Sequence, residues 1–143
     1  MSDKQYIAYE GAHFTIEWYF LENGNSEALT YYQSLEGFQR RKLLFLFKRM
    51  GDHGKISDLT KFNHEGDQIY AFKPQPERFL CFFVKGGKIL VTHGFRKKQQ
   101  KLPIVEKERA LAYQGLGVEV KKIHFGIFCR IDRIRESFGR LLF

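Results

Sequence analysis

The segment from residue 78 to residue 95 constrains the fold most, because it predicts a β-hairpin whose first strand is deeply buried. Residues 79–84 (FLCFFV) are apolar at every position, which is typical of a central strand covered on both faces. Residues 85–88 (KGGK) then predict a tight turn, since two glycines accept the positive φ angles of such turns. Residues 89–95 are expected to return as the antiparallel partner strand.

The elements around this hairpin indicate an α+β fold. Alternating apolar residues predict a strand over residues 14–20, and Ser26 is placed to cap a helix that extends to residue 35. Apolar residues at helical spacing predict a second helix over residues 36–51, with Gly51 as its C-terminal cap. A strand over residues 69–73 and a helix over residues 103–113 complete the order β-α-α-β-β-β-α. This order predicts a small, mostly antiparallel sheet with helices packed on one face, the other face being free for a ligand.

Positive charge is concentrated in the second half of the chain. The net charge is +8 at pH 7, and residues 78–105 contain seven Lys or Arg but no Asp or Glu. A solvated basic surface is one interpretation of this excess. A stretch of this length without an acid favours a surface that faces a polyanion, and nucleic acid is the leading ligand class.

The length of 143 residues suits one domain, expected over residues 1–113. Gly115 and Gly117 are expected to form a hinge before a C-terminal extension over residues 114–143. This extension either adds a strand and a helix or is a poorly ordered tail. No apolar run approaches the ~18 residues of a membrane span, and the N-terminus lacks a signal-peptide pattern, so we expect a cytoplasmic protein that does not bind membranes.

Two stretches resemble a known family. Residues 67–73 (DQIYAFK), which lead to residues 78–83 (RFLCFF), and residues 93–103 (HGFRKKQQKLP) are similar to motifs of the phage-derived HigB-like branch of the RelE/ParE toxin superfamily. The second stretch is the more specific of the two. The resemblance covers roughly residues 14–113. It departs in the first stretch, where Ala71 stands in place of the usual acid and Lys73 in place of the usual arginine.

The resemblance implies a RelE-like fold and a toxin of a type II toxin–antitoxin system. Its implied activity is that of an endoribonuclease, an mRNA interferase that cuts mRNA on the ribosome and so inhibits translation. A ribose 2′-hydroxyl would attack the adjacent phosphate without a metal. The implied partners are a cognate antitoxin, often a helix-turn-helix protein in this branch, and the ribosome with its mRNA. A ParE-like inhibitor of DNA gyrase and an inactive phage-derived nucleic-acid-binding protein remain alternatives.

Three residues are candidates for the chemistry. Lys73 and Arg78 flank a turn with two prolines, and their cationic groups could stabilise the extra negative charge on phosphorus in the transition state. Histidine has an unperturbed pKa near 6.5, which makes His93 a candidate for proton transfer. Its alternation with Ile89, Val91 and Phe95, however, favours a buried structural role.

Other residues are candidates for binding RNA. Cations near the hairpin are expected to contact phosphates, and one tyrosine to stack on a base. This predicted set comprises Arg96, Lys97, Lys98, Lys101, Lys85, Lys88 and Tyr70. The five histidines show no ligand spacing and no cofactor motif is present, so neither a metal nor a cofactor is expected.

Overall fold

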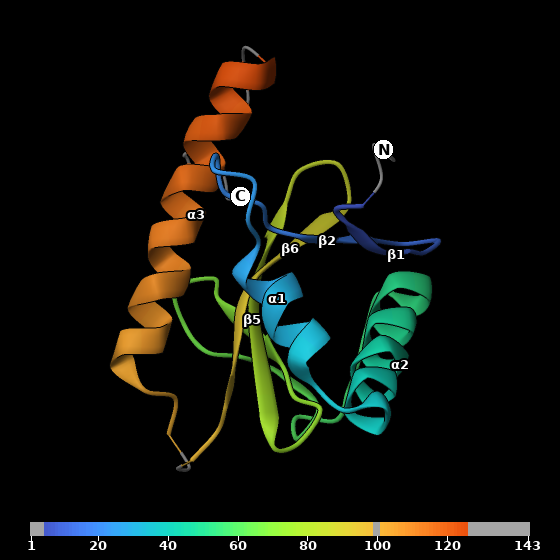
Figure 1. The fold of residues 1–143 in the computed structure, drawn as a ribbon. Coiled ribbons are helices and arrows are strands. Elements are labelled where there is room, and N and C mark those ends of the chain that lie inside the picture. Colours follow the sequence, from blue (N-terminus) through green and yellow to red (C-terminus); the bar gives the residue numbers. More distant parts are fainter. Residues whose placement is uncertain (1–4, 99–100, 126–143) are drawn as a thin grey trace.

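In the computed structural model, which describes residues 5–98 and 101–125, six strands form one sheet in the order β1-β2-β6-β5-β4-β3 (Figure 1). The strands are β1 (Ile7–Glu10), β2 (Thr15–Trp18), β3 (Phe62–His64), β4 (Tyr70–Phe72), β5 (Glu77–Val84) and β6 (Lys88–Arg96). The helices are α1 (Glu27–Ser34), α2 (Gly37–His53) and α3 (Ile104–Phe125). All neighbouring strands are antiparallel except β2 and β6, which are parallel. The α+β class with a mostly antiparallel, RelE-like sheet is therefore confirmed.

The predicted hairpin lies at the centre of this sheet. Strands β5 and β6 pair from Glu77↔Arg96 to Val84↔Lys88, and Gly86 and Gly87 adopt φ angles of 89° and 71° in the turn. Residues of β5 contribute alternately to two hydrophobic clusters, one on each face of the sheet. The burial of the central strand on both faces is thus confirmed.

Helices α1 and α2 cover the first face. The inward side of α2 is formed by Leu43, Leu46, Phe47 and Met50, all buried at the helical spacing that the sequence predicts. Helix α1 begins as expected, because the Ser26 hydroxyl accepts a hydrogen bond from the Leu29 amide at 3.2 Å.

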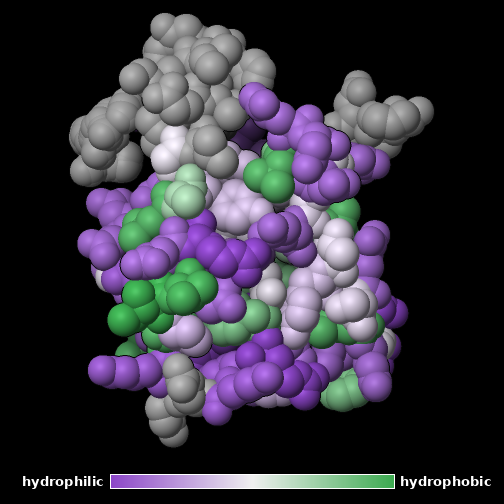
Figure 2. Space-filling model, turned by 60° about the vertical axis from the view of Figure 1, so that its left-hand side comes forward, coloured by the Kyte–Doolittle hydropathy of each residue, from purple (hydrophilic) through white to green (hydrophobic). Residues whose placement is uncertain are grey.

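Helix α3 covers the second face, so the prediction of helices on one face only is wrong. Ala110 and Tyr113 of α3 are buried in a cluster with Leu80 and Phe82 of β5. These strand residues are as apolar as those facing α1, and a second layer of structure must pack on them to bury them. Figure 2 shows this side of the molecule as mostly hydrophilic, with several separate hydrophobic patches. The second face of the sheet is therefore not free for a ligand where α3 lies.

Two strands and one helix end differ from the prediction. Strands β1 and β3 were not expected, since each contains only three or four residues and carries no clear alternation. Helix α2 continues past Gly51 and ends with Gly54 in the left-handed conformation, at φ 76°. Gly51 lies inside the helix, and a Cβ at this position would lie 2.7 Å from the Tyr9 ring, so close packing rather than a helix end accounts for this glycine.

Helix α3 is longer than expected and runs through Gly115 and Gly117, where the sequence predicted a hinge. It therefore crosses the predicted boundary between residues 113 and 114. Residues 126–143 lie outside the described residues, so the division into a domain and an extension stays a prediction.

A β-bulge in β6 changes which residues face α3. Leu80 pairs with His93 while Cys81 pairs with Val91, so β6 has one extra residue at this point. The alternation of side chains reverses there. Ile89 and Val91 point toward α1 and α2, whereas Phe95 packs with the cluster under α3. Alternation along the strand predicted that His93 lies on the same face of the sheet as Ile89 and Val91. This placement is therefore wrong.

Candidate nucleic-acid interface

Three cations gather where β4 ends, β5 begins and β6 ends. Lys73 follows β4 directly, Arg78 is the second residue of β5, and the Lys97 amide donates to the Pro76 carbonyl at 2.9 Å. Burial lowers the pKa of Lys73, and the charges of Arg78 and Lys97 lower it further, with Glu65 opposing them. The structure therefore brings the two predicted catalytic cations into one electrostatic cluster.

Lys73 is nearly buried but borders an open groove. The residue is 9% exposed, and its Nζ donates to the Leu59 carbonyl at 3.0 Å. The groove has a volume of about 400 Å³ and lies between α2 and the turn that contains Pro74 and Gln75. Lys73 can thus be approached from the α2 side of the molecule.

Arg78 is more deeply buried. Its side chain is 5% exposed, and Nη1 lies 3.5 Å from the Glu65 Oε2. Its Nε is buried and has no hydrogen-bond partner among the residues that the structure describes. The Arg78 Nε is closed to solvent, so Arg78 acts on its surroundings through its positive charge rather than through a free donor.

Arg96 is held by a buried carboxylate. Glu77 is fully buried and accepts hydrogen bonds from the Tyr31 hydroxyl at 2.5 Å and from the Arg96 Nη2 at 2.8 Å. Burial and the hydrogen bond to Glu77 raise the pKa of Tyr31 to about 12. The Arg96 side chain nevertheless remains 59% exposed, so Glu77 fixes a guanidinium that still meets solvent.

The remaining predicted RNA-binding residues fall into separate places. Lys98 and Lys101 are exposed in the segment after β6. Lys85 and Lys88 lie at the opposite end of the β5–β6 hairpin, roughly 25 Å away for an eight-residue strand. Lys88 also forms an ion pair of 3.4 Å with Glu17. The predicted set is therefore not one continuous patch.

Tyr70 packs within the sheet. Its ring stacks on Phe62 at 5.6 Å and on His64 at 4.6 Å between centroids. Both ring contacts are made across neighbouring strands β3 and β4. A base would have to replace one of these rings before it could stack on Tyr70.

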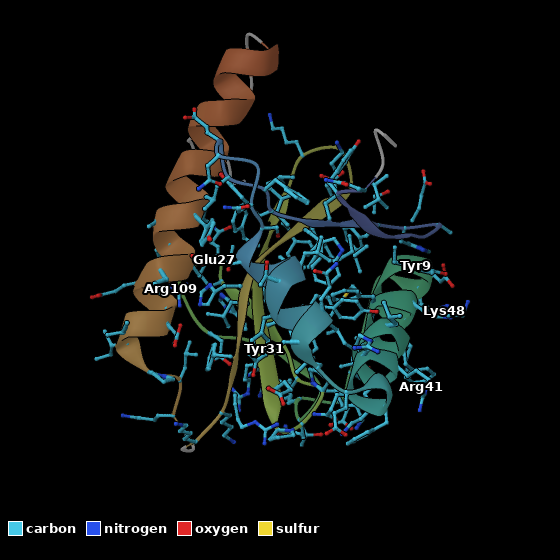
Figure 3. The ribbon with its side chains drawn as sticks, in the orientation of Figure 1. Tyr9, Glu27, Tyr31, Arg41, Lys48 and Arg109 are labelled. Carbon is cyan, nitrogen blue, oxygen red and sulfur yellow. The ribbon has the colours of Figure 1, made fainter. Side chains whose placement is uncertain are left out.

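His93 lies in a polar network that joins three elements. It is 1% exposed, and its ring nitrogens lie 3.0 Å from the Thr92 hydroxyl and 3.0 Å from Glu106 Oε1 of α3. Glu106 also pairs with Arg109, which in turn pairs with Glu27, the first residue of α1 (Figure 3). The geometry around His93 therefore attaches α3 to the sheet and to α1.

Acid should weaken this attachment. Burial lowers the pKa of His93 below its usual value of about 6.5, the nearby Arg109 acts in the same direction, and Glu106 and Glu27 oppose them. Because the unfolded chain then binds the proton more readily, the contribution of neutral His93 to stability is complete above pH 6.5 and is lost as the pH falls through its folded pKa. We expect the melting temperature of the His93→Gln variant to fall less than that of the unaltered protein between pH 7.5 and pH 5. Parallel curves for the two proteins would contradict this role.

The groove beside Lys73 contains functional candidates that the sequence analysis missed. Phe38, Arg41, Lys42, Phe45 and Lys61 line it, and the two phenylalanines are 54% and 57% exposed. The signal was present in the sequence, since two phenylalanines occur seven residues apart on the polar side of a predicted amphipathic helix.

Among residues 5–98 and 101–125, no three His, Cys, Asp or Glu side chains gather in a way that could hold a metal ion. In the same residues no helix is both long and apolar enough to cross a membrane.

The fold and the basic end of the sheet define the class of protein, a small α+β protein with cations gathered beside an open groove. A family model described as phage-derived protein Gp49-like (DUF891) matches residues 31–114. This match spans more than half of the chain, and the chain therefore belongs to the Gp49-like family, a toxin-like family related to RelE- and HigB-type toxins. The comparison with curated proteins gave no match.

Proposed function

We propose that this protein is the toxin of a toxin–antitoxin pair and that it cuts mRNA on the ribosome. The single observation that carries this proposal is Lys73, a lysine with a lowered pKa that borders an open groove beside Arg78 and Lys97. Membership of a toxin-like family supports the same function.

The proposed reaction needs no metal. The ribose 2′-oxygen passes its proton to water and forms a bond to the adjacent phosphorus while the bond from phosphorus to the 5′-oxygen breaks, which leaves a 2′,3′-cyclic phosphate and, once the 5′-oxygen is protonated, a 5′-hydroxyl. Negative charge builds up on the phosphate oxygens in the transition state, and nearby cations stabilise it. Arg78 and Lys97 would supply the positive charge that stabilises the transition state.

Lys73 would donate a proton to the departing 5′-oxygen. A lysine with an ordinary pKa near 10.4 gives up its proton reluctantly at neutral pH. Burial and two neighbouring cations lower the pKa of Lys73 and so make its proton easier to transfer. His93 is a poorer candidate, because Thr92 and Glu106 already occupy its ring nitrogens.

The proposed partners are the ribosome with its mRNA and a cognate antitoxin. Arg96, Lys98 and Lys101 are exposed cations close to the end of β6, and we assign them to contacts with the phosphate backbone. An antitoxin that covered this end of the sheet would block access of RNA to the cations.

Pulse-labelling after tightly controlled expression in bacteria tests the proposal. Amino-acid and thymidine incorporation are followed in parallel during the first minutes, and new mRNA ends are mapped. We expect early loss of protein synthesis, continued DNA synthesis, and mRNA fragments with 5′-hydroxyl ends. Failure of DNA synthesis first would instead favour a gyrase inhibitor, and no effect on either would favour an inactive binding protein.

A further inference from the structure

The outward face of α2 combines aromatic and cationic side chains in one groove. Its inner residues are buried in the core, whereas Phe38, Arg41 and Phe45 follow one another along the exposed side at helical spacing. Figure 3 shows Arg41 and Lys48 pointing away from the body of the molecule. Two phenylalanine rings are thus presented to solvent on either side of an arginine.

The groove is strongly cationic. Arg41, Lys42, Lys61 and Lys73 line it together with the two phenylalanines, and no Asp or Glu does. Lys42 and Lys73 donate to backbone carbonyls, of Gln75 and Leu59. Within the described part of the chain, none of these four cations forms an ion pair with a carboxylate. Charge complementarity therefore calls for an anionic occupant.

The arrangement suits a single strand better than a duplex. Proteins that bind single-stranded nucleic acids combine cations along the backbone with aromatic rings on which unpaired bases stack. Phe38 and Phe45 are separated by about 10 Å along the helix axis, so they can receive two different bases, that on Phe45 being on the ring face opposite the Arg49 guanidinium. In a duplex the bases are stacked inside the helix and would not meet either ring.

We propose that the groove between α2 and the Pro74–Gln75 turn binds the single-stranded RNA that flanks the cleaved bond, with bases on Phe38 and Phe45 and phosphates on Arg41 and Lys61. This proposal rests on the proposed function, because the groove ends at Lys73. It adds a binding site for the substrate on a helix that lies outside the two sequence motifs.

The experiment measures binding without cleavage. The probe is a fluorescent single-stranded RNA of twelve nucleotides with 2′-O-methyl groups throughout, which lacks the attacking hydroxyl. Fluorescence anisotropy gives its Kd for the unaltered protein and for the variants Phe38→Ala, Phe45→Ala and Arg41→Ala. Matched controls on the same helix but outside the groove are Leu44→Ala and Lys48→Ala. All five side chains are exposed, and circular dichroism verifies that each variant folds.

We expect each phenylalanine variant to raise Kd by about fivefold or more, since loss of one stacked base has an effect of this size. Arg41→Ala should weaken binding and reduce the slope of log Kd against log salt by about 0.7, the value for one phosphate contact on a single strand. The two controls should change Kd less than twofold. Equal Kd values for all variants would overturn the proposal, even if the protein cuts mRNA.

Competition with poly-L-glutamate distinguishes RNA from an acidic polypeptide. We expect this polymer to displace the probe poorly from the unaltered protein. The opposite outcome is that poly-L-glutamate displaces the probe as well as unlabelled RNA does, and that its own affinity falls in the phenylalanine variants as much as that of RNA. In that case the groove would be a docking surface for acidic protein segments, and the RNA proposal would be wrong. Because the probe cannot be cut, failure of the cleavage assay does not affect either outcome.

Discussion

Replacing Lys73 with glutamine is expected to lower mRNA cleavage by at least a hundredfold, because loss of a positioned proton donor typically reduces the rate by this much or more. The amide can still donate a hydrogen bond toward the Leu59 carbonyl but carries neither charge nor a transferable proton. Cleavage is measured in a cell-free translation reaction by mapping of mRNA ends. The matched control is Lys55→Gln, which removes an exposed lysine outside the groove.

A second substitution separates charge from proton transfer. Lys73→Arg keeps the positive charge but holds its proton too tightly to donate it near neutral pH. We expect this variant to retain RNA binding and to lose most of the cleavage. Full cleavage by Lys73→Arg would show that charge alone matters, and full cleavage by Lys73→Gln would remove Lys73 from the mechanism.

Replacing Gly11 with alanine is expected to destabilise the protein by about 3 kcal/mol or more, which corresponds to roughly 10 °C in melting temperature. A Cβ at Gly11 would lie 2.2 Å from the carbonyl carbon of Gly51 in α2. The Gly51 carbonyl also accepts hydrogen bonds from the His13 and Phe14 amides at 2.7 and 3.0 Å. The clash is therefore between backbones that are already fixed, and no rotation of a side chain can relieve it.

Gly115→Ala is the matched control for this experiment. A Cβ at Gly115 meets no heavy atom within 4 Å, and the residue lies inside α3. Alanine is preferred over glycine in a helix interior, so this variant should be more stable by about 0.5–1 kcal/mol. Urea unfolding of both variants gives the two free energies of unfolding. Equal stability of Gly11→Ala and the unaltered protein would show that β1 and α2 do not pack as closely as described.

The parts of the fold that follow from local patterns were predictable from the sequence. The β5–β6 hairpin depends on an apolar run and two turn glycines, and the buried side of α2 depends on helical spacing. Short strands such as β3 exist only because a neighbouring strand pairs with them, and no local pattern marks them. The position of α3 likewise depends on which face of β5 remains uncovered.

The candidate site was predictable only in part for a similar reason. The proximity of Lys73 and Arg78 follows from a turn that the prolines mark. The environment of His93 does not follow from the sequence, because the β-bulge beside His93 reverses the alternation of side chains and turns the His93 ring toward α3. The groove also escaped prediction, since residues from α2 and from the segments around Lys61 and Pro74 meet only in three dimensions.

The parallel pairing of β2 with β6 has a consequence for synthesis of the chain. Ile16 pairs with Ile89, so the N-terminal hairpin can join the sheet only after β6 has left the ribosome. Until then Trp18 of β2 and Phe47 of α2, which pack together in the finished protein, lack the central strands that bury them. Contacts between such distant segments form late and leave apolar surface exposed meanwhile. A nascent chain of this protein therefore acquires its complete sheet, and with it the cationic end formed by β4, β5 and β6, only after Arg96 has left the ribosome.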